Sequence, residues 1–196
     1  MSAADSRSPG RRSFVDGACP ASRTVCAPPS RLPAQAGENE EFQAVVPAPG
    51  FCLGVQCDDE EITEIHFLEP RAEMPPANPL AAETVRQLKA YLADPAFLFG
   101  LPLRPSGTAF QRRVWEEIAA IPCGSTRSYG EVAKALKNAP RAVGQACGAN
   151  PFPLVVPCHR VIGAHAGLGG FARHGGGFLL DIKRWLLAHE GSLPGA

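Results

Sequence analysis

The sequence predicts an α+β fold, in which a small N-terminal antiparallel β-sheet domain with one helix precedes a mainly helical C-terminal domain containing a helix-turn-helix. Two observations predict this fold. Residues 42–70 contain short apolar segments separated by turn-prone residues, which is typical of antiparallel strands. From residue 108 onward the chain instead carries repeated helix-start signals with apolar residues at helical spacing.

The composition divides the chain into three parts. Residues 1–37 are rich in Ser, Ala, Pro and Arg and show no apolar period, so we expect a disordered or variable extension. A transit peptide is the alternative, although no amphipathic helix is visible there. We assign residues 38–103 to an N-terminal α/β domain and residues 104–196 to the C-terminal domain.

Three strands are expected in the N-terminal domain. Residues 42–47 and 51–56 flank the turn-prone segment Pro47-Ala48-Pro49-Gly50, which predicts a hairpin. Residues 62–68 alternate between two faces and supply the third strand.

Four helix starts follow the strands. A cap residue followed by proline, or a capping box, satisfies the free backbone N–H groups of a first helical turn. These signals occur at Asn78-Pro79, at Thr108-Ala109-Phe110-Gln111, at Ser128-Tyr129-Gly130-Glu131 and, as a lone proline, at Pro140.

The helices that begin near residues 128 and 140 are short and are joined by about three residues, which predicts a helix-turn-helix. The same pattern is common in helical bundles. Several basic residues lie on or beside it, opposed only by Glu131: Arg127, Lys134, Lys137 and Arg141.

Charge is distributed unevenly, although the formal net charge is zero. Residues 1–100 carry 8 Lys/Arg against 14 Asp/Glu, giving −6, and residues 101–196 carry 11 against 5, giving +6. The basic half is suited to approach phosphate groups. An accident of surface composition is the alternative explanation.

The cysteines favour a reducing, cytoplasmic environment. There are 7, an odd number, and no apolar signal segment is visible, which argues against a disulfide framework. No apolar run approaches the roughly 18 residues that a membrane helix needs. Cys19, Cys26, Cys52 and Cys57 lack a zinc-ligand spacing, so we expect no metal, and we interpret Cys123 and Cys147 as small packing residues.

The segment after residue 150 carries the chemistry. The apolar run Leu154-Val155-Val156 predicts a buried strand leading to Cys158. A free thiol is only a few per cent ionised at neutral pH, so a nucleophilic Cys158 needs a base such as His159, which Glu190 could orient. The alternative is a core thiol beside a hydrogen-bonded histidine.

The wider pattern resembles the O6-alkylguanine-DNA alkyltransferases, also called methylated-DNA–protein-cysteine methyltransferases. The similarity covers roughly residues 107–191 in five ordered segments. They are Thr126-Arg127-Ser128-Tyr129-Gly130-Glu131, Arg141-Ala142-Val143-Gly144, Asn150-Pro151, Pro157-Cys158-His159-Arg160-Val161-Ile162 and Lys183-Arg184-Trp185-Leu186-Leu187-Ala188-His189-Glu190-Gly191.

This resemblance implies direct DNA repair. A methyl or other alkyl group would move irreversibly from O6 of guanine, and from O4 of thymine, to Cys158, once per molecule and without a cofactor. His159 and Glu190 would activate the thiol through a water molecule, and Tyr129 would give a proton to the leaving base. Arg141 would fill the gap left by the extruded nucleotide, since the reacting carbon is inaccessible inside the duplex.

The resemblance also implies the surrounding sites. DNA contacts are expected from Arg127, Ser128, Lys134, Arg141 and Ala142, and the substrate pocket from Asn150, Pro153, Val161, Phe171 and Ala172. The expected partner is double-stranded DNA containing O6-alkylguanine, bound by a monomer in the cytoplasm, on the nucleoid.

Two departures from the family pattern stand out: Phe171 replaces a tyrosine of many relatives, and the loop from Ala172 is longer than in many of them. Two rival functions remain open at this point. One is a non-enzymatic protein that binds alkylated DNA or regulates transcription. The other is a Cys-His hydrolase, which would leave the basic helix-turn-helix unexplained.

Overall fold

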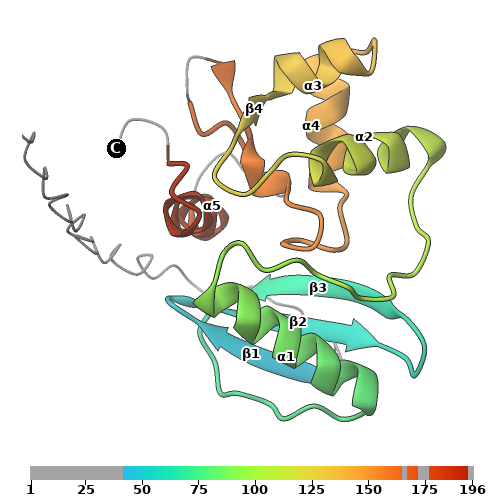
Figure 1. Ribbon diagram of the computed structural model, residues 1–196, viewed down its shortest axis with the longest axis vertical. Coiled ribbons are helices and arrows are strands. Elements are labelled where there is room, and N and C mark those ends of the chain that lie inside the picture. The colour runs from blue at the N-terminus through green and yellow to red at the C-terminus, as the bar shows by residue number, and fades with distance from the viewer. Residues whose placement is uncertain (1–41, 165–166, 172–176, 194–196) are drawn as a thin grey trace, which may run out of the picture.

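The computed structural model describes residues 42–164, 167–171 and 177–193. The predicted extension, residues 1–37, lies outside the described residues. Figure 1 shows a sheet covered by one helix at one end of the molecule, a group of three helices at the other, and a final helix between them. The predicted α+β fold is confirmed. No helix in this described part of the chain is long and apolar enough to cross a membrane.

The sheet has three antiparallel strands in the order β1-β2-β3. They are β1 (Ala44–Ala48), β2 (Phe51–Cys57) and β3 (Ile62–Leu68), so the predicted bounds are correct to within two residues. The hairpin between β1 and β2 turns at Gly50, whose φ of 84° suits a residue without a Cβ. The register pairs Val46 with Leu53, and Leu53 with Phe67.

Helix α1 (Pro79–Ala93) packs on β1 and β2. It begins as predicted, because the Asn78 side chain accepts a hydrogen bond from the backbone N–H of Ala81 at 2.7 Å and Pro79 follows the cap. Its buried face ends in Tyr91, which is 1% exposed and therefore needs a partner for its hydroxyl.

Three helices form the predicted helical domain: α2 (Ala109–Ala119), α3 (Tyr129–Ala135) and α4 (Pro140–Gly148). Both predicted capping boxes are formed, by Thr108 with Gln111 and by Ser128 with Glu131. Helices α3 and α4 pack together as a helix-turn-helix, and the Trp115 indole of α2 donates a hydrogen bond to the carbonyl of Ala146 at 2.9 Å.

A short parallel pairing brings the helix-turn-helix to the nucleophile segment. Strand β4 (Arg127–Ser128) immediately precedes α3, and β5 (Val161–Ile162) immediately follows the 3₁₀ helix η1 (Cys158–Arg160). Because β4 pairs with β5, the start of α3 lies beside the end of η1. Tyr129 and Cys158, far apart in sequence, therefore lie at one site.

The predicted strand at Leu154-Val155-Val156 is wrong. These residues form a turn, in which the backbone N–H of Val156 donates to the carbonyl of Phe152 at 2.9 Å and Leu154 has a φ of 73°. Pro153 and Pro157 bracket the run, and a proline cannot donate to a sheet. The apolar side chains of Leu154 and Val156 are buried, so the run correctly indicated burial but not conformation.

The last helix, α5 (Phe178–His189), ties the two ends of the molecule together. Its Trp185 ring meets Phe51 of β2 edge to face, with centroids 5.4 Å apart. One apolar core, which includes Phe51, Tyr91, Trp115 and Leu186, runs from the sheet to the helices. The position of α5 is therefore fixed by packing on both sides.

Candidate active site

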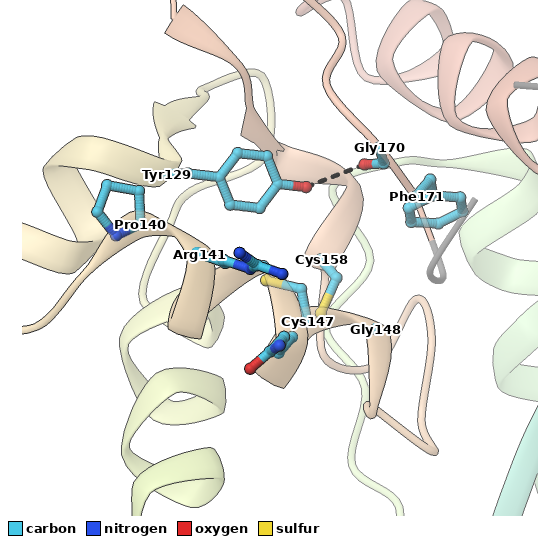
Figure 2. A pocket seen from close by; sticks show the side chains of 10 residues that line it. Tyr129, Pro140, Arg141, Cys147, Gly148, Cys158, Gly170 and Phe171 are labelled. Carbon is cyan, nitrogen blue, oxygen red and sulfur yellow. Dashed lines mark hydrogen bonds between the residues drawn. The ribbon is translucent and has the colours of Figure 1, made fainter. Parts of the chain in front are cut away.

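A pocket of about 450 Å³ lies between the helix-turn-helix and the residues before α5, with Cys158 in its wall. Tyr129 of α3, Arg141 and Cys147 of α4, and Phe171 line it with Cys158 (Figure 2). Cys158 is only 5% exposed. The thiol is thus shielded from bulk solvent but borders a cavity that a small planar group can enter.

Asn150 holds the turn that presents Cys158. Its side-chain amide donates to the Cys158 sulfur at 3.2 Å and to the carbonyl of Val156 at 3.0 Å. Its carbonyl oxygen accepts from the backbone N–H of Phe152 at 3.0 Å. A single side chain therefore fixes the backbone on both sides of the turn and also contacts the sulfur.

The Cys158 thiol is neutral in this environment. A hydrogen bond with the Cys147 thiol and burial of the group raise the pKa of Cys158 well above its usual value, although Asn150 and the nearby Lys183 oppose this. Removing water favours the uncharged form of a thiol. Ionisation consequently requires a base.

The carboxylate of Glu190, at the end of α5, is fully buried and receives hydrogen bonds from three side chains. The Tyr91 hydroxyl donates at 2.8 Å, the His159 Nε2 lies at 2.8 Å, and the Arg160 guanidinium donates twice, each time at 2.9 Å. Burial alone would raise the pKa of Glu190, but these partners outweigh it and lower that pKa to about 2. Arg160 also donates to the carbonyl of Ile121 at 2.6 Å.

These contacts determine the state of His159. Burial lowers the pKa of the imidazole despite the opposing effect of Glu190, so the ring is neutral at pH 7. An ionised carboxylate can only accept hydrogen bonds, so the ring proton must be on Nε2, facing Glu190. Nδ1 then carries the free lone pair and can accept a proton.

The Tyr129 hydroxyl faces the pocket and donates to the carbonyl of Gly170 at 2.9 Å, as the dashed line in Figure 2 shows. Burial raises the pKa of Tyr129 above its usual value, so the phenol keeps its proton. The Ser128 cap and the β4–β5 pairing fix the position of this residue. Tyr129 therefore places a protonated hydroxyl at the pocket wall.

Lys183 is completely buried, and its ammonium donates to the carbonyls of Val161, Leu168 and Gly170 at 2.7, 2.6 and 3.2 Å. It thus fastens α5 to the backbone beside the pocket. Burial lowers its pKa to about 8. The sequence analysis assigned no role to Lys183; the available signal was a lysine among the apolar residues of a helix, which is rarely buried without partners.

Comparison with known proteins agrees with this geometry. Residues 109–192 match the family described as "6-O-methylguanine DNA methyltransferase, DNA binding domain". A methylated-DNA–protein-cysteine methyltransferase of Methanosarcina acetivorans is 43% identical over 159 residues, which are 77% of this chain and 99% of the relative. The chain belongs to the methylated-DNA–protein-cysteine methyltransferase family.

Two further similar proteins, one compared by sequence and one by structure, support the same family assignment. A Mycolicibacterium paratuberculosis methylated-DNA–protein-cysteine methyltransferase is 52% identical over 116 residues, covering 58% of this chain and 67% of that protein. A crystal structure described as Mycobacterium tuberculosis OGT in complex with DNA has a TM-score of 0.64 and 39% identity, over 76% of this chain and 91% of that one.

Not every residue predicted to contact DNA is free to do so in this methyltransferase. Arg127 forms an ion pair with Glu117 of α2 at 2.5 Å, a partner that the sequence analysis did not anticipate. The Ser128 hydroxyl is engaged in the capping box with Glu131. Both residues position the start of α3 through these contacts.

The remaining predicted DNA contacts lie on the helix-turn-helix. Lys134 on α3 and Arg141 on α4 are exposed, and Ala142 is half-buried. Arg141 is the one that also lines the pocket. Arg141 is therefore exposed on α4 and also borders the pocket that Cys158 lines.

The predicted pocket residues separate into groups. Phe171 lines the main pocket, whereas Pro153 lines a second cavity of about 230 Å³ that also borders Cys158 and Phe171. Val161 is fully buried and contributes its carbonyl to Lys183. Ala172 lies outside the described residues. Within residues 42–164, 167–171 and 177–193, no group of three or more His, Cys, Asp or Glu side chains could hold a metal ion.

The hydrogen bonds to Glu190 predict a specific acid sensitivity. The folded pKa of Glu190, about 2, lies below the unfolded value of about 4.3. Between these two pH values the folded state binds fewer protons than the unfolded state, so the free energy of unfolding decreases as the pH is lowered. We expect urea unfolding to show on the order of 2–3 kcal/mol of stabilisation above about pH 5 that is lost towards pH 2. Glu190→Gln should remove this component of the pH dependence.

The matched control is Glu60→Gln, which changes an exposed carboxyl in the turn between β2 and β3. It should leave the difference in unfolding free energy between pH 7 and acid pH as in the wild type. If Glu190→Gln and wild type lost stability in parallel on acidification, the hydrogen-bonded carboxylate would not be the source of the effect.

Proposed function

We propose that this protein repairs DNA directly, by transferring a methyl or other alkyl group from O6 of guanine, and from O4 of thymine, to the sulfur of Cys158. The product is a stable thioether, so each molecule acts once. The observation that carries the proposal is that Cys158 borders a pocket whose other walls come from the helix-turn-helix and from Gly170 and Phe171. Thiol chemistry and a DNA-reading element thus share one cavity.

The residues around the pocket supply both proton transfers. The Cys158 proton passes to Nδ1 of the neutral His159, directly or through one water molecule. The sulfur then forms a bond to the alkyl carbon as the bond from that carbon to guanine O6 breaks. The electron pair stays on the base, and the Tyr129 hydroxyl neutralises it by donating a proton. Solvent exchange returns the proton from His159 to Tyr129.

The same arrangement requires the target base to leave the duplex. The alkyl carbon of a stacked guanine cannot reach a sulfur that is 5% exposed. Extruding a nucleotide costs a few kcal/mol, and this cost is offset when a side chain takes its place in the stack. Exposed Arg141, at the start of α4 and on the pocket wall, is placed to do this. The partner is double-stranded DNA carrying the lesion, and the protein acts as a monomer in the cytoplasm, on the nucleoid.

The decisive experiment is mass spectrometry after incubation with duplex DNA containing O6-methylguanine. The tryptic peptide 142–160 contains Cys147 and Cys158 and no other cysteine. We expect one added methyl group, assigned by fragmentation to Cys158. Cys158→Ser should give no methylated peptide.

Two outcomes would contradict the proposal. Methylation of Cys147 instead of Cys158 would show that Cys147 is the methyl acceptor. Tight binding to the alkylated duplex with the lesion retained would favour the rival function, a protein that marks damage without repairing it.

Arg141 provides a second prediction. Arg141→Ala should slow repair of duplex DNA by at least about tenfold, because only the duplex requires base extrusion. Reaction with free O6-benzylguanine should be nearly unchanged. Single-turnover rates measured on both substrates test this, with Arg86→Ala, an exposed arginine of α1, as the control. Equal slowing on both substrates would show that Arg141 does not act in extrusion.

A further inference from the structure

Cys147 lies in the last turn of α4 with its side chain next to Cys158 (Figure 2). This position beside the pocket differs from that of the simple packing residue that its sequence context predicts. The Cys147 thiol lies close enough to Cys158 to contribute to raising the pKa of Cys158. Cys147 is 9% exposed and Cys158 5%, and both line the main pocket and the smaller cavity behind it.

The pairing is specific among the cysteines that the structure describes. The sulfur of Cys52 instead contacts the backbone of Arg71, at 3.4 Å from the N–H, and that of Cys57 donates to the Asn78 side chain at 3.7 Å. Among the described cysteines, Cys147 and Cys158 line the same two cavities, whereas Cys52 and Cys57 line neither of them. A small solute that enters the pocket therefore meets both sulfurs at once.

The chain geometry suits a bond between them. A disulfide requires Cβ atoms about 3.5–4.5 Å apart, and because side-chain rotation moves only the sulfurs, any further approach of the two residues comes from the backbone. Cys147 lies at the end of a helix, and Cys158 lies in a single 3₁₀ turn that follows the irregular segment 149–157. Neither residue is in the middle of a regular element that would have to break.

We propose that Cys147 and Cys158 form a reversible disulfide when the unreacted protein is exposed to hydrogen peroxide. In the first step the Cys158 sulfur attacks one peroxide oxygen, the O–O bond breaks, and a sulfenic acid and one water form. In the second step the Cys147 sulfur attacks the Cys158 sulfur and releases the second water. The two thiols are oxidised by two electrons in total, and the peroxide is reduced by two.

The consequence rests on the proposed function. A disulfide at Cys158 removes the nucleophile and so blocks alkyl transfer, but a thiol reductant restores it. Without Cys147, the sulfenic acid would remain exposed to further peroxide and proceed to sulfinic acid, which thiols do not reduce. Cys147 is thus a resolving thiol that preserves an acceptor usable only once.

The test treats the full-length protein with hydrogen peroxide, blocks free thiols with N-ethylmaleimide, and maps the tryptic peptide 142–160. We expect this peptide to be lighter by two hydrogen atoms and to carry no maleimide. After reduction with dithiothreitol it should accept maleimide at both cysteines. Methyl transfer should fall by at least about tenfold after peroxide and return after reduction.

Two matched variants complete the design. Cys147→Ser changes the pocket wall, so its methyl-transfer rate before treatment serves as its own reference; after peroxide its Cys158 should carry two added oxygens, and reduction should not restore that reference rate. Cys123→Ser should behave as the wild type. The proposal is overturned if wild-type Cys158 is also oxidised irreversibly, or if its disulfide partner is another cysteine. Since the peptide mass is read without DNA, a failure of methyl transfer in untreated protein would sink the proposed function alone.

Discussion

The structure depends on one buried carboxylate. Glu190 receives donors from Tyr91 of α1 and from His159 and Arg160 of η1, so a single residue joins the N-terminal helix, the nucleophile segment and the last helix. A buried charge is costly unless its hydrogen-bonding capacity is filled, and here three side chains fill it. The same contacts fix the tautomer of His159. Stability and chemistry therefore have a common origin: loss of any donor would both weaken the fold and disturb the base.

The environment of Cys158 explains how a nucleophile can persist until it meets its substrate. Burial and the Cys147 contact hold the sulfur as a neutral thiol, while Asn150 and Lys183 favour the anion. In the proposed reaction, an extruded guanine enters the pocket, brings its alkyl carbon to the Cys158 sulfur, and His159 accepts the thiol proton. Because α4 forms part of the pocket wall, a guanine that enters the pocket contacts the same helix that is expected to bind DNA.

Helix starts were predicted correctly from local sequence signals, whereas contacts between residues far apart in the sequence were not predicted. Asn78, Thr108 and Ser128 begin their helices as predicted, because a cap depends on residues within one turn. The apolar run at Leu154 correctly predicted burial. It did not predict the turn between Pro153 and Pro157, in which Leu154 has a positive φ. Tyr91 lies 99 residues from Glu190, and Lys183 bonds to carbonyls 13 to 22 residues away, so no local pattern identified either. Two further pairings were not predicted, because each forms only when separate elements pack together. They are the ion pair of Arg127 with Glu117 and the proximity of Cys147 to Cys158. The roles of the site residues came from family resemblance, not from spacing.

We infer that burial keeps His159 neutral while Glu190 holds its proton on Nε2, which leaves Nδ1 to accept the Cys158 proton. Nitrogen-15 NMR of the His159 ring in the unreacted protein, titrated through neutral pH, measures both properties directly. The account predicts a neutral imidazole protonated at Nε2 at pH 7, with a pKa below the usual value of about 6.5. An imidazolium at neutral pH, or a neutral ring protonated at Nδ1, would contradict it, because neither form can take a proton from the thiol at that atom.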